Sequence, residues 1–307
     1  MGRTNSKIQT VLGPIYPNEL GPALVHEHLV IDLSGPKNDP DACIGTPSVM
    51  IPEVAAMVGA GGRAIVELTN TGMGRDIDRL REISSATGCH VIAATGFYQV
   101  SYHPEWLRSK TVDEIADIMV REVTCGIDGT AAKAGVIGEI GTSRSRVHPE
   151  EERVLRAAAR ANLRTGVPIS THCTLGTMAT EQLDILESEG VELHRVAIGH
   201  LDLVDDIEYH SEVARRGAFV QYDTVGKHNY QPDDVRIRLI LDMLDRGFVR
   251  QVMLSCDVTR RSHLKSSGGN GYDYLFRVFL PELMAGGLDQ ASVKVITNDN
   301  PARFLAF

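Results

Sequence analysis

Two histidines in the segment VHEHL, His26 and His28, lie one residue apart within an otherwise apolar stretch. Side chains alternate between the two faces of a β-strand, so a strand here would point both imidazoles to one side and Glu27 to the other. Two imidazoles directed at one place are suited to holding a metal ion. The alternative is a pair of ordinary half-buried histidines, because a pattern as short as H-x-H also arises by chance.

Apolar runs rich in valine and isoleucine supply strands that would position these residues. Eight such runs occur, at residues 23–32, 64–70, 91–98, 134–142, 167–172, 195–200, 218–224 and 251–258. Between and after them we expect helices at 51–60, 75–88, 111–126, 149–166, 179–190, 205–217, 232–247 and 272–287. This alternation predicts an α/β fold, a closed (β/α)8 TIM barrel. A doubly wound open sheet would need a Gly-rich phosphate-binding turn after its first strand, and VHEHLVIDLSG has none.

Six side chains of metal-ligating type fall at the carboxyl ends of these runs, which is where barrel enzymes place their chemistry. They are His26, His28, Glu139, His172, His200 and Asp257. Four imidazoles and two carboxylates exceed the needs of one tetrahedral ion and suit two divalent ions. We assign His26, His28 and Asp257 to the first ion. His172 and His200 are assigned to the second ion, with Glu139 bridging the two.

The chemistry expected of such a centre is hydrolysis. Two divalent ions would stabilise a bridging hydroxide, because coordination lowers the pKa of water from about 15.7 toward ~7. That hydroxide would be the nucleophile. Asp257 could also act in catalysis, by taking a proton during the attack and delivering it to the leaving group. The alternative role for Asp257 is a helix N-cap.

Composition excludes several other classes of protein. The 307 residues, 43% hydrophobic and 23% charged, fit one globular barrel domain over 1–307, with 1–22 as an extension that could form a small hairpin under the barrel. A net charge of −9 without a long basic run argues against a nucleic-acid partner. No signal peptide or membrane-spanning run is present, so we expect a cytoplasmic protein. Five scattered cysteines without C-x-x-C spacing fit reduced thiols.

Cationic residues follow the last two strands. Arg260 and Arg261 lie in the loop DVTRRSHLKSSGG, and Lys227 lies in the loop after the seventh strand. Such side chains suit a carboxylate or phosphate, so we expect a small-molecule substrate with an anionic group remote from the bond being cut. The alternative is a solvated loop or ion pairs with acids such as Asp223. Tyr98 could orient a scissile carbonyl or stack on the substrate, or it could be a core tyrosine.

Several segments together resemble one known family. They are HEH at 26–28, GRD at 74–76, AATGFY at 93–98, RTGVPISTH at 164–172, ESEG at 187–190, RVAIGH at 195–200 and NPARFL at 300–305. From about residue 9 to the C-terminus the chain resembles the phosphotriesterase family of the amidohydrolase superfamily. Within it, HEHLVIDLSG, KAGVIGEIGTS, DTVGK and CDVTRRSHLK resemble the phosphotriesterase homology proteins. The resemblance implies the barrel, hydrolysis, a homodimer and two metal ions, zinc first and Mn²⁺ or Co²⁺ as alternatives.

One feature separates this chain from the best-known phosphotriesterases, which bridge their metals with a carboxylated lysine on the fourth strand. Here that strand has no lysine beyond Lys133 at its far end, and Glu139 is similar to the glutamate bridge of the homology-protein branch. Our leading hypothesis is therefore a hydrolase of a carboxylate ester or lactone that carries a phosphate or carboxylate. The alternatives are hydrolysis of an N-acyl amino acid type of amide or of a phosphoester, and a small-molecule binding protein without turnover.

Overall fold

Eight parallel strands form the centre of the protein in a computed structural model that describes residues 6–307. Around the sheet they are β3 (Ala23–Glu27), β6 (Ala64–Glu67), β7 (His90–Thr95), β8 (Val136–Thr142), β9 (Ile169–Cys173), β10 (Val196–Gly199), β11 (Phe219–Tyr222) and β12 (Val252–Leu254). Every hydrogen-bonded pair of neighbours in this sheet is parallel. Each predicted apolar run contains one of these strands, so the predicted TIM barrel is confirmed.

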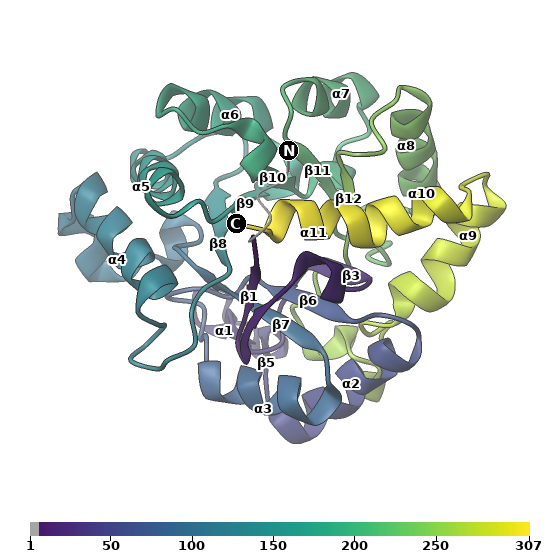
Figure 1. The fold of residues 1–307 in the computed structure, drawn as a ribbon, viewed down its shortest axis with the longest axis horizontal. Coiled ribbons are helices and arrows are strands. Elements are labelled where there is room, and N and C mark those ends of the chain that lie inside the picture. The colour runs from purple at the N-terminus through teal and green to yellow at the C-terminus, as the bar shows by residue number, and fades with distance from the viewer. Residues whose placement is uncertain (1–5) are drawn as a thin grey trace.

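Helices surround the strands on the outside (Figure 1). They are α2 (Pro47–Gly59), α3 (Ile77–Thr87), α4 (Val112–Thr124), α5 (Pro149–Thr165), α6 (Ala179–Ser188), α7 (Ile207–Arg215), α8 (Asp233–Asp245) and α9 (Leu280–Ala285). Most lie within two residues of the predicted helices, but α2 begins at Pro47 rather than at residue 51. The predicted helix over 272–287 is divided, because a π-helical turn at Leu275–Phe279 precedes α9.

Further short elements close the two ends of the barrel. The helices α10 (Gln290–Lys294) and α11 (Asn300–Leu305) were not expected from the sequence, and α11 crosses in front of the strands in Figure 1. Near it, β1 (Ile8–Thr10) and β2 (Gly13–Ile15) form an antiparallel hairpin. The predicted extension over 1–22 also included residues 1–5, which lie outside the described residues. The long loop after β3 holds β4 (Ile31–Asp32), α1 (Ser34–Lys37) and β5 (Cys43–Ile44).

No helix in residues 6–307 combines the length and the apolar character needed to cross a bilayer. Apolar side chains instead fill two layers of a globular core. Val25 and Val136 belong to the layer inside the barrel, whereas Leu24 and Ile137 belong to the layer between the strands and the helices. The two layers show which way each strand residue faces.

Irregular strand register turns two ligand-type residues into the barrel. The pairing of β3 with β6 shifts between Leu24 and Glu27, and the pairing of β8 with β9 shifts between Ile137 and Ile140. Uninterrupted alternation from Leu24 or Ile137 would place His26 and Glu139 in the outer layer. Each shift reverses the facing of the residues that follow it, as a β-bulge does, and both side chains point inward.

His200 and Asp257 reach the interior by a different route. Each follows its strand in the left-handed backbone region, with φ of 63° and 50° respectively. Residues other than glycine rarely adopt this conformation, so contacts from the surrounding structure must hold it. His172 needs no such help, because plain alternation along β9 from Ile169 in the outer layer turns it inward.

Candidate metal centre

The structure brings the six predicted ligand residues together at the carboxyl ends of the strands. His26 lies on β3 and His28 directly follows it, Glu139 lies on β8, His172 lies on β9, and His200 and Asp257 follow β10 and β12. All six are buried, and the most accessible of them, His172, exposes only 9% of its surface.

Glu139 lies between two groups of histidines. Its Oε2 is 3.3 Å from His26 Nε2, and its Oε1 is 3.4 Å from His28 Nε2. On the other side, Oε2 is 2.9 Å from His172 Nδ1, which is itself 2.7 Å from His200 Nε2. Within each group the potential ligand atoms lie within 4.8 Å of one another. One carboxylate shared by two groups is the geometry of a binuclear metal site.

Asp257 completes the group that contains His26 and His28. Its Oδ1 lies 3.4 Å from His28 Nε2 and 3.9 Å from His26 Nε2, while its other oxygen contacts Lys227 Nζ. Burial opposes ionisation of this carboxyl group, but Lys227 and His28 hold the pKa of Asp257 well below its ordinary value. Asp257 therefore faces the other ligands as a carboxylate.

Unpartnered nitrogen atoms test whether these residues fit metal ions. The Nε2 atoms of His26 and His28 are buried and have no hydrogen-bond partner among residues 6–307. A buried polar atom without a partner destabilises the fold by roughly 1–3 kcal/mol, so two of them side by side call for a ligand. Neutral imidazoles together with carboxylates form the donor set that zinc and similar divalent ions take. The residues present therefore fit a binuclear metal centre.

Asp223, at the end of β11, orients one histidine of each group. Its Oδ2 lies 2.8 Å from His26 Nδ1, and its Oδ1 lies 2.8 Å from His200 Nδ1. Burial opposes the charge of this carboxylate, but His200 and His26 hold its pKa below the ordinary value. Because Asp223 accepts a hydrogen bond from each Nδ1–H, each Nε2 is left unprotonated and free to ligate. From the sequence, Asp223 is expected only as an ion-pair partner of the cationic loop, although its position at a strand end is a signal for a place in this centre.

The other two imidazoles are oriented by neutral side chains. Thr69 Oγ1 lies 2.9 Å from His28 Nδ1 and in turn donates to Glu67 at 2.6 Å. The amide group of Gln99 lies 2.9 Å from His172 Nε2, and His172 Nδ1 faces Glu139 Oε2 at 2.9 Å. With its amide oxygen turned toward Nε2, Gln99 accepts a hydrogen bond from Nε2–H and leaves Nδ1 free to ligate. These partners carry no charge of their own, and the spacing of ligand-type residues did not reveal them.

A cavity of about 260 Å³ opens onto this centre. Tyr98, Lys227 and Arg260 line it, as do Tyr102 and Tyr230. Tyr98 Oη lies 3.2 Å from His172 Nε2, and burial raises the pKa of Tyr98, which keeps its hydroxyl protonated as a hydrogen-bond donor.

The predicted cationic residues do not all face this cavity. Arg260 lies on its rim, with Nε 3.4 Å from Asp39 Oδ2. Arg261, predicted to bind substrate beside it, does not line the cavity. Its Nε instead donates to the carbonyl oxygen of Cys43 at 2.8 Å, because the chain turns into a short 3₁₀ segment at this residue.

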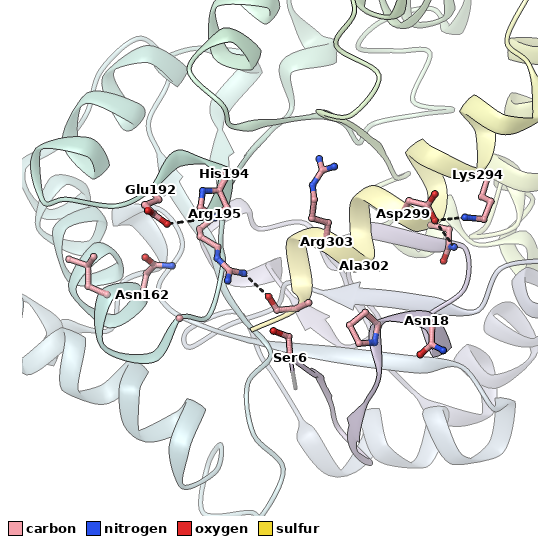
Figure 2. A pocket seen from close by; sticks show the side chains of 15 residues that line it. Ser6, Asn18, Asn162, Glu192, His194, Arg195, Lys294, Asp299, Ala302 and Arg303 are labelled. Atoms are coloured by element: carbon pink, nitrogen blue, oxygen red, sulfur yellow. Dashed lines mark hydrogen bonds and ion pairs between the residues drawn. The ribbon is translucent and has the colours of Figure 1, made fainter. Parts of the chain in front are cut away.

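A larger hollow of about 1080 Å³ lies at the opposite end of the barrel, beside α11 (Figure 2). Arg195 and Arg303 line it, but Arg195 donates to the carbonyl oxygen of Ala306 at 2.6 Å, and Arg303 donates to the carbonyl oxygen of Arg250. None of the three potential metal-binding groups among residues 6–307 lies there. In TIM barrels this end serves stability and the opposite end serves catalysis, so the smaller cavity is the candidate active site.

Residues 6–305 match the model of the phosphotriesterase family. The chain belongs to this family. The resemblance seen in the sequence is thereby confirmed, and the chain is a phosphotriesterase-family hydrolase with residues positioned for two metal ions.

Relatives within the phosphotriesterase family differ in the bond they cut. The chain is 46% identical over 284 residues to the phosphotriesterase homology protein of Escherichia coli, covering 92% of this chain and 97% of that one. A crystal structure of that protein, with phosphate in its active site, superposes with a TM-score of 0.92 at 45% identity, covering 94% of this chain and 99% of that one.

Two more distant relatives have named activities. The N-acetyltaurine hydrolase of Xenopus tropicalis is 31% identical over an alignment of 350 residues that covers both chains completely. A lactonase structure from Listeria monocytogenes has a TM-score of 0.94 at 32% identity, covering 98% of this chain and 99% of that one. Members of the family therefore include enzymes that cut lactones and enzymes that cut amides.

Proposed function

We propose that this protein hydrolyses a small carboxylate ester or lactone that bears an anionic group. The observation that carries the proposal is Glu139, which lies within reach of both histidine groups at the floor of a cavity whose rim carries Arg260. At about 260 Å³ this cavity is smaller than the roughly 300–1,000 Å³ of pockets for drug-sized ligands, so the substrate is small. The lactonase relative supports the choice of bond.

His26, His28 and Asp257 would hold one divalent ion, His172 and His200 the other, and Glu139 both. When bound, the two ions would lower the pKa of a coordinated water and polarise the scissile carbonyl. Asp257 takes the proton released at the cavity floor and returns it to the leaving group. Zinc is our first choice of metal, because imidazole and carboxylate ligands suit it, with Mn²⁺ or Co²⁺ as alternatives.

The rim residues provide substrate selectivity in this proposal. Arg260 binds the anionic group, and Lys227, from the neighbouring loop, lines the same cavity and contacts Asp257. Tyr98 donates a hydrogen bond to the substrate carbonyl from its position beside His172. The hydrogen bond of a guanidinium to an anion is worth about 1.5–3 kcal/mol, which corresponds to roughly 10- to 100-fold in kcat/KM.

The test uses matched substrates. Protein purified without chelator is assayed for metal and then with lactones and esters in pairs with and without a phosphate or carboxylate. We expect about two ions per chain, a preference for the anionic member of each pair, and loss of that preference in R260M. R261M is the matched control and should keep the preference. Equal turnover of the two members of each pair by the unmodified protein would refute the assignment of Arg260.

The second candidate is hydrolysis of an N-acyl amide, which the full-length similarity to N-acetyltaurine hydrolase supports. N-acetylated amino and sulfonic acids, tested beside the lactones, separate the two candidates. Turnover of the amides alone would replace the ester proposal. Two bound ions with no turnover of esters, lactones, amides or phosphoesters would favour a binding protein.

A further inference from the structure

Glu27, the middle residue of VHEHL, is completely buried on the side of the strand opposite His26 and His28. Its side chain meets the segment that follows β12. Oε1 accepts hydrogen bonds from Ser255 Oγ at 2.7 Å, from Cys256 N at 2.7 Å and from Asp257 N at 3.2 Å, and Oε2 accepts one from Val258 N at 2.8 Å. One carboxylate therefore receives three successive backbone N–H groups.

This arrangement accounts for the unusual backbone of Asp257. Successive N–H groups point at a common centre when one residue of the segment is left-handed, and the resulting concave nest binds an anion. Asp257 is the left-handed residue here, with φ of 50°. The carboxylate of Glu27 is the anion in the nest, so its hydrogen bonds stabilise a conformation that an aspartate otherwise disfavours.

Glu27 also joins the first and last strands of the barrel. Within the described residues β3 and β12 share no strand ladder. The main-chain link between them is the hydrogen bond from Asp257 N to the carbonyl oxygen of His26 at 3.2 Å, and Ser255 Oγ also lies 2.8 Å from that oxygen. Glu27 therefore contributes much of the connection that sets Asp257 beside the two histidines.

His200, the other left-handed ligand residue, is held in the same manner. Its backbone N–H donates to Asp223 Oδ1 at 2.9 Å, and Asp223 lies at the end of the next strand around the barrel. Each of the two left-handed residues thus has its N–H bonded to a buried carboxylate that is not itself among the proposed ligands. We propose that Glu27 is a positioning residue that orients Asp257 and thereby sets the affinity of the first metal ion, whatever the substrate is.

The experiment measures metal affinity ion by ion. Unmodified protein and E27Q are dialysed against zinc buffers, zinc per chain is measured, and anomalous scattering from crystals assigns the ion that is lost. In E27Q an amide NH₂ must face one of the backbone N–H groups, so the nest opens. We expect the ion next to Asp257 to bind 10- to 100-fold more weakly, as is typical when a residue that orients a ligand is changed, with the other ion unaffected.

Glu53, on α2, supplies a matched control that contacts the loop after β12. It is also buried, and it accepts hydrogen bonds from Lys265 N at 3.1 Å and Ser266 N at 2.8 Å without touching Asp257. E53Q should bind both ions as the unmodified protein does. A general loosening of the loop would instead weaken zinc binding in both variants and would overturn the proposal.

Two further variants test the role of Glu27 if E27Q does not fold well. E27D retains the charge but is one methylene shorter, so it should lose the same ion. In a D257N background, replacing Glu27 should add little to the loss of affinity, because its effect acts through Asp257. Unchanged affinity in a folded Glu27 variant, equal loss of both ions, or fully additive losses with D257N would each refute the role assigned to Glu27.

Discussion

Replacing Asp223 by asparagine should weaken one metal ion more than the other. Oδ1 accepts two hydrogen bonds from His200, one from its backbone N–H and one at Nδ1, whereas Oδ2 meets only His26 Nδ1. The carbonyl of an asparagine would stay on the His200 side, which leaves its NH₂ group facing His26. His26 would then have to accept at Nδ1 and carry its proton on Nε2.

That proton would occupy the direction in which His26 ligates. His26 Nε2 lies 3.3 Å from Oε2 of the proposed bridge Glu139, and a hydrogen on this nitrogen would take up the lone pair with which His26 binds the ion. Loss of such an orienting partner typically weakens metal binding 10- to 100-fold, or about 1.4–2.8 kcal/mol. We therefore expect D223N to lose the ion beside His26 and His28 first, with the ion at His172 and His200 less affected.

Dialysis against a series of zinc buffers, followed by elemental analysis, gives the two affinities. D273N is a suitable control, because Asp273 is a buried carboxylate that pairs with Lys265 and Arg277 and touches none of the imidazoles. Circular dichroism establishes that both variants are folded. Retention of both ions at unmodified affinity in D223N, or earlier loss of the His172 ion, would refute this tautomer of His26.

Three other outcomes follow from the structure. D257N should lower turnover by roughly 10²- to 10⁴-fold while substrate still binds in calorimetry, and near-normal turnover would remove Asp257 from proton transfer. Removing the metal should lower the midpoint of thermal unfolding. An ion whose free concentration is 100 times its Kd adds about 2.7 kcal/mol to the free energy of unfolding, so an unchanged midpoint would contradict a bound centre. Burial lowers the pKa of His210 from 6.5 to about 4. Between these two pH values His210 is protonated in the unfolded chain but stays neutral in the folded protein. Stability should therefore fall by up to about 3 kcal/mol between pH 6.5 and 4, and denaturant unfolding of H210Q should show a correspondingly flatter dependence on pH.

The barrel and the set of ligand-type residues followed from the sequence because they depend on local patterns. Apolar runs mark the strands, and a TIM barrel gathers the carboxyl ends of its strands at one face. His172 even takes the direction that plain alternation gives. The same alternation continued from Leu24 would have turned His26 outward, and only the shift in strand register corrects it. Such a shift depends on the neighbouring strand and leaves no mark in the run itself.

The residues that orient the ligands were harder to predict. Asp223 and Glu27 are carboxylates at strand ends, so their type and position match those of true ligands, but their roles follow from contacts with residues distant in the sequence. Glu27 contacts residues about 230 positions away in the chain, and no local pattern encodes that contact. Arg261 was also hard to predict. Arg260 and Arg261 are adjacent in one loop, but they face different surroundings because the chain turns between them.

The position of Glu139 between its neighbours implies an order in which the two ion sites form as the chain folds. Glu139 and His172 are 33 residues apart and His172 and His200 are 28 apart, on or directly after consecutive strands, so their site is complete once β8, β9 and β10 have associated. The site of His26 and His28 requires a contact across about 230 residues, which forms only when the barrel closes. Uptake of the second equivalent of zinc during refolding should therefore report the meeting of the first and last strands.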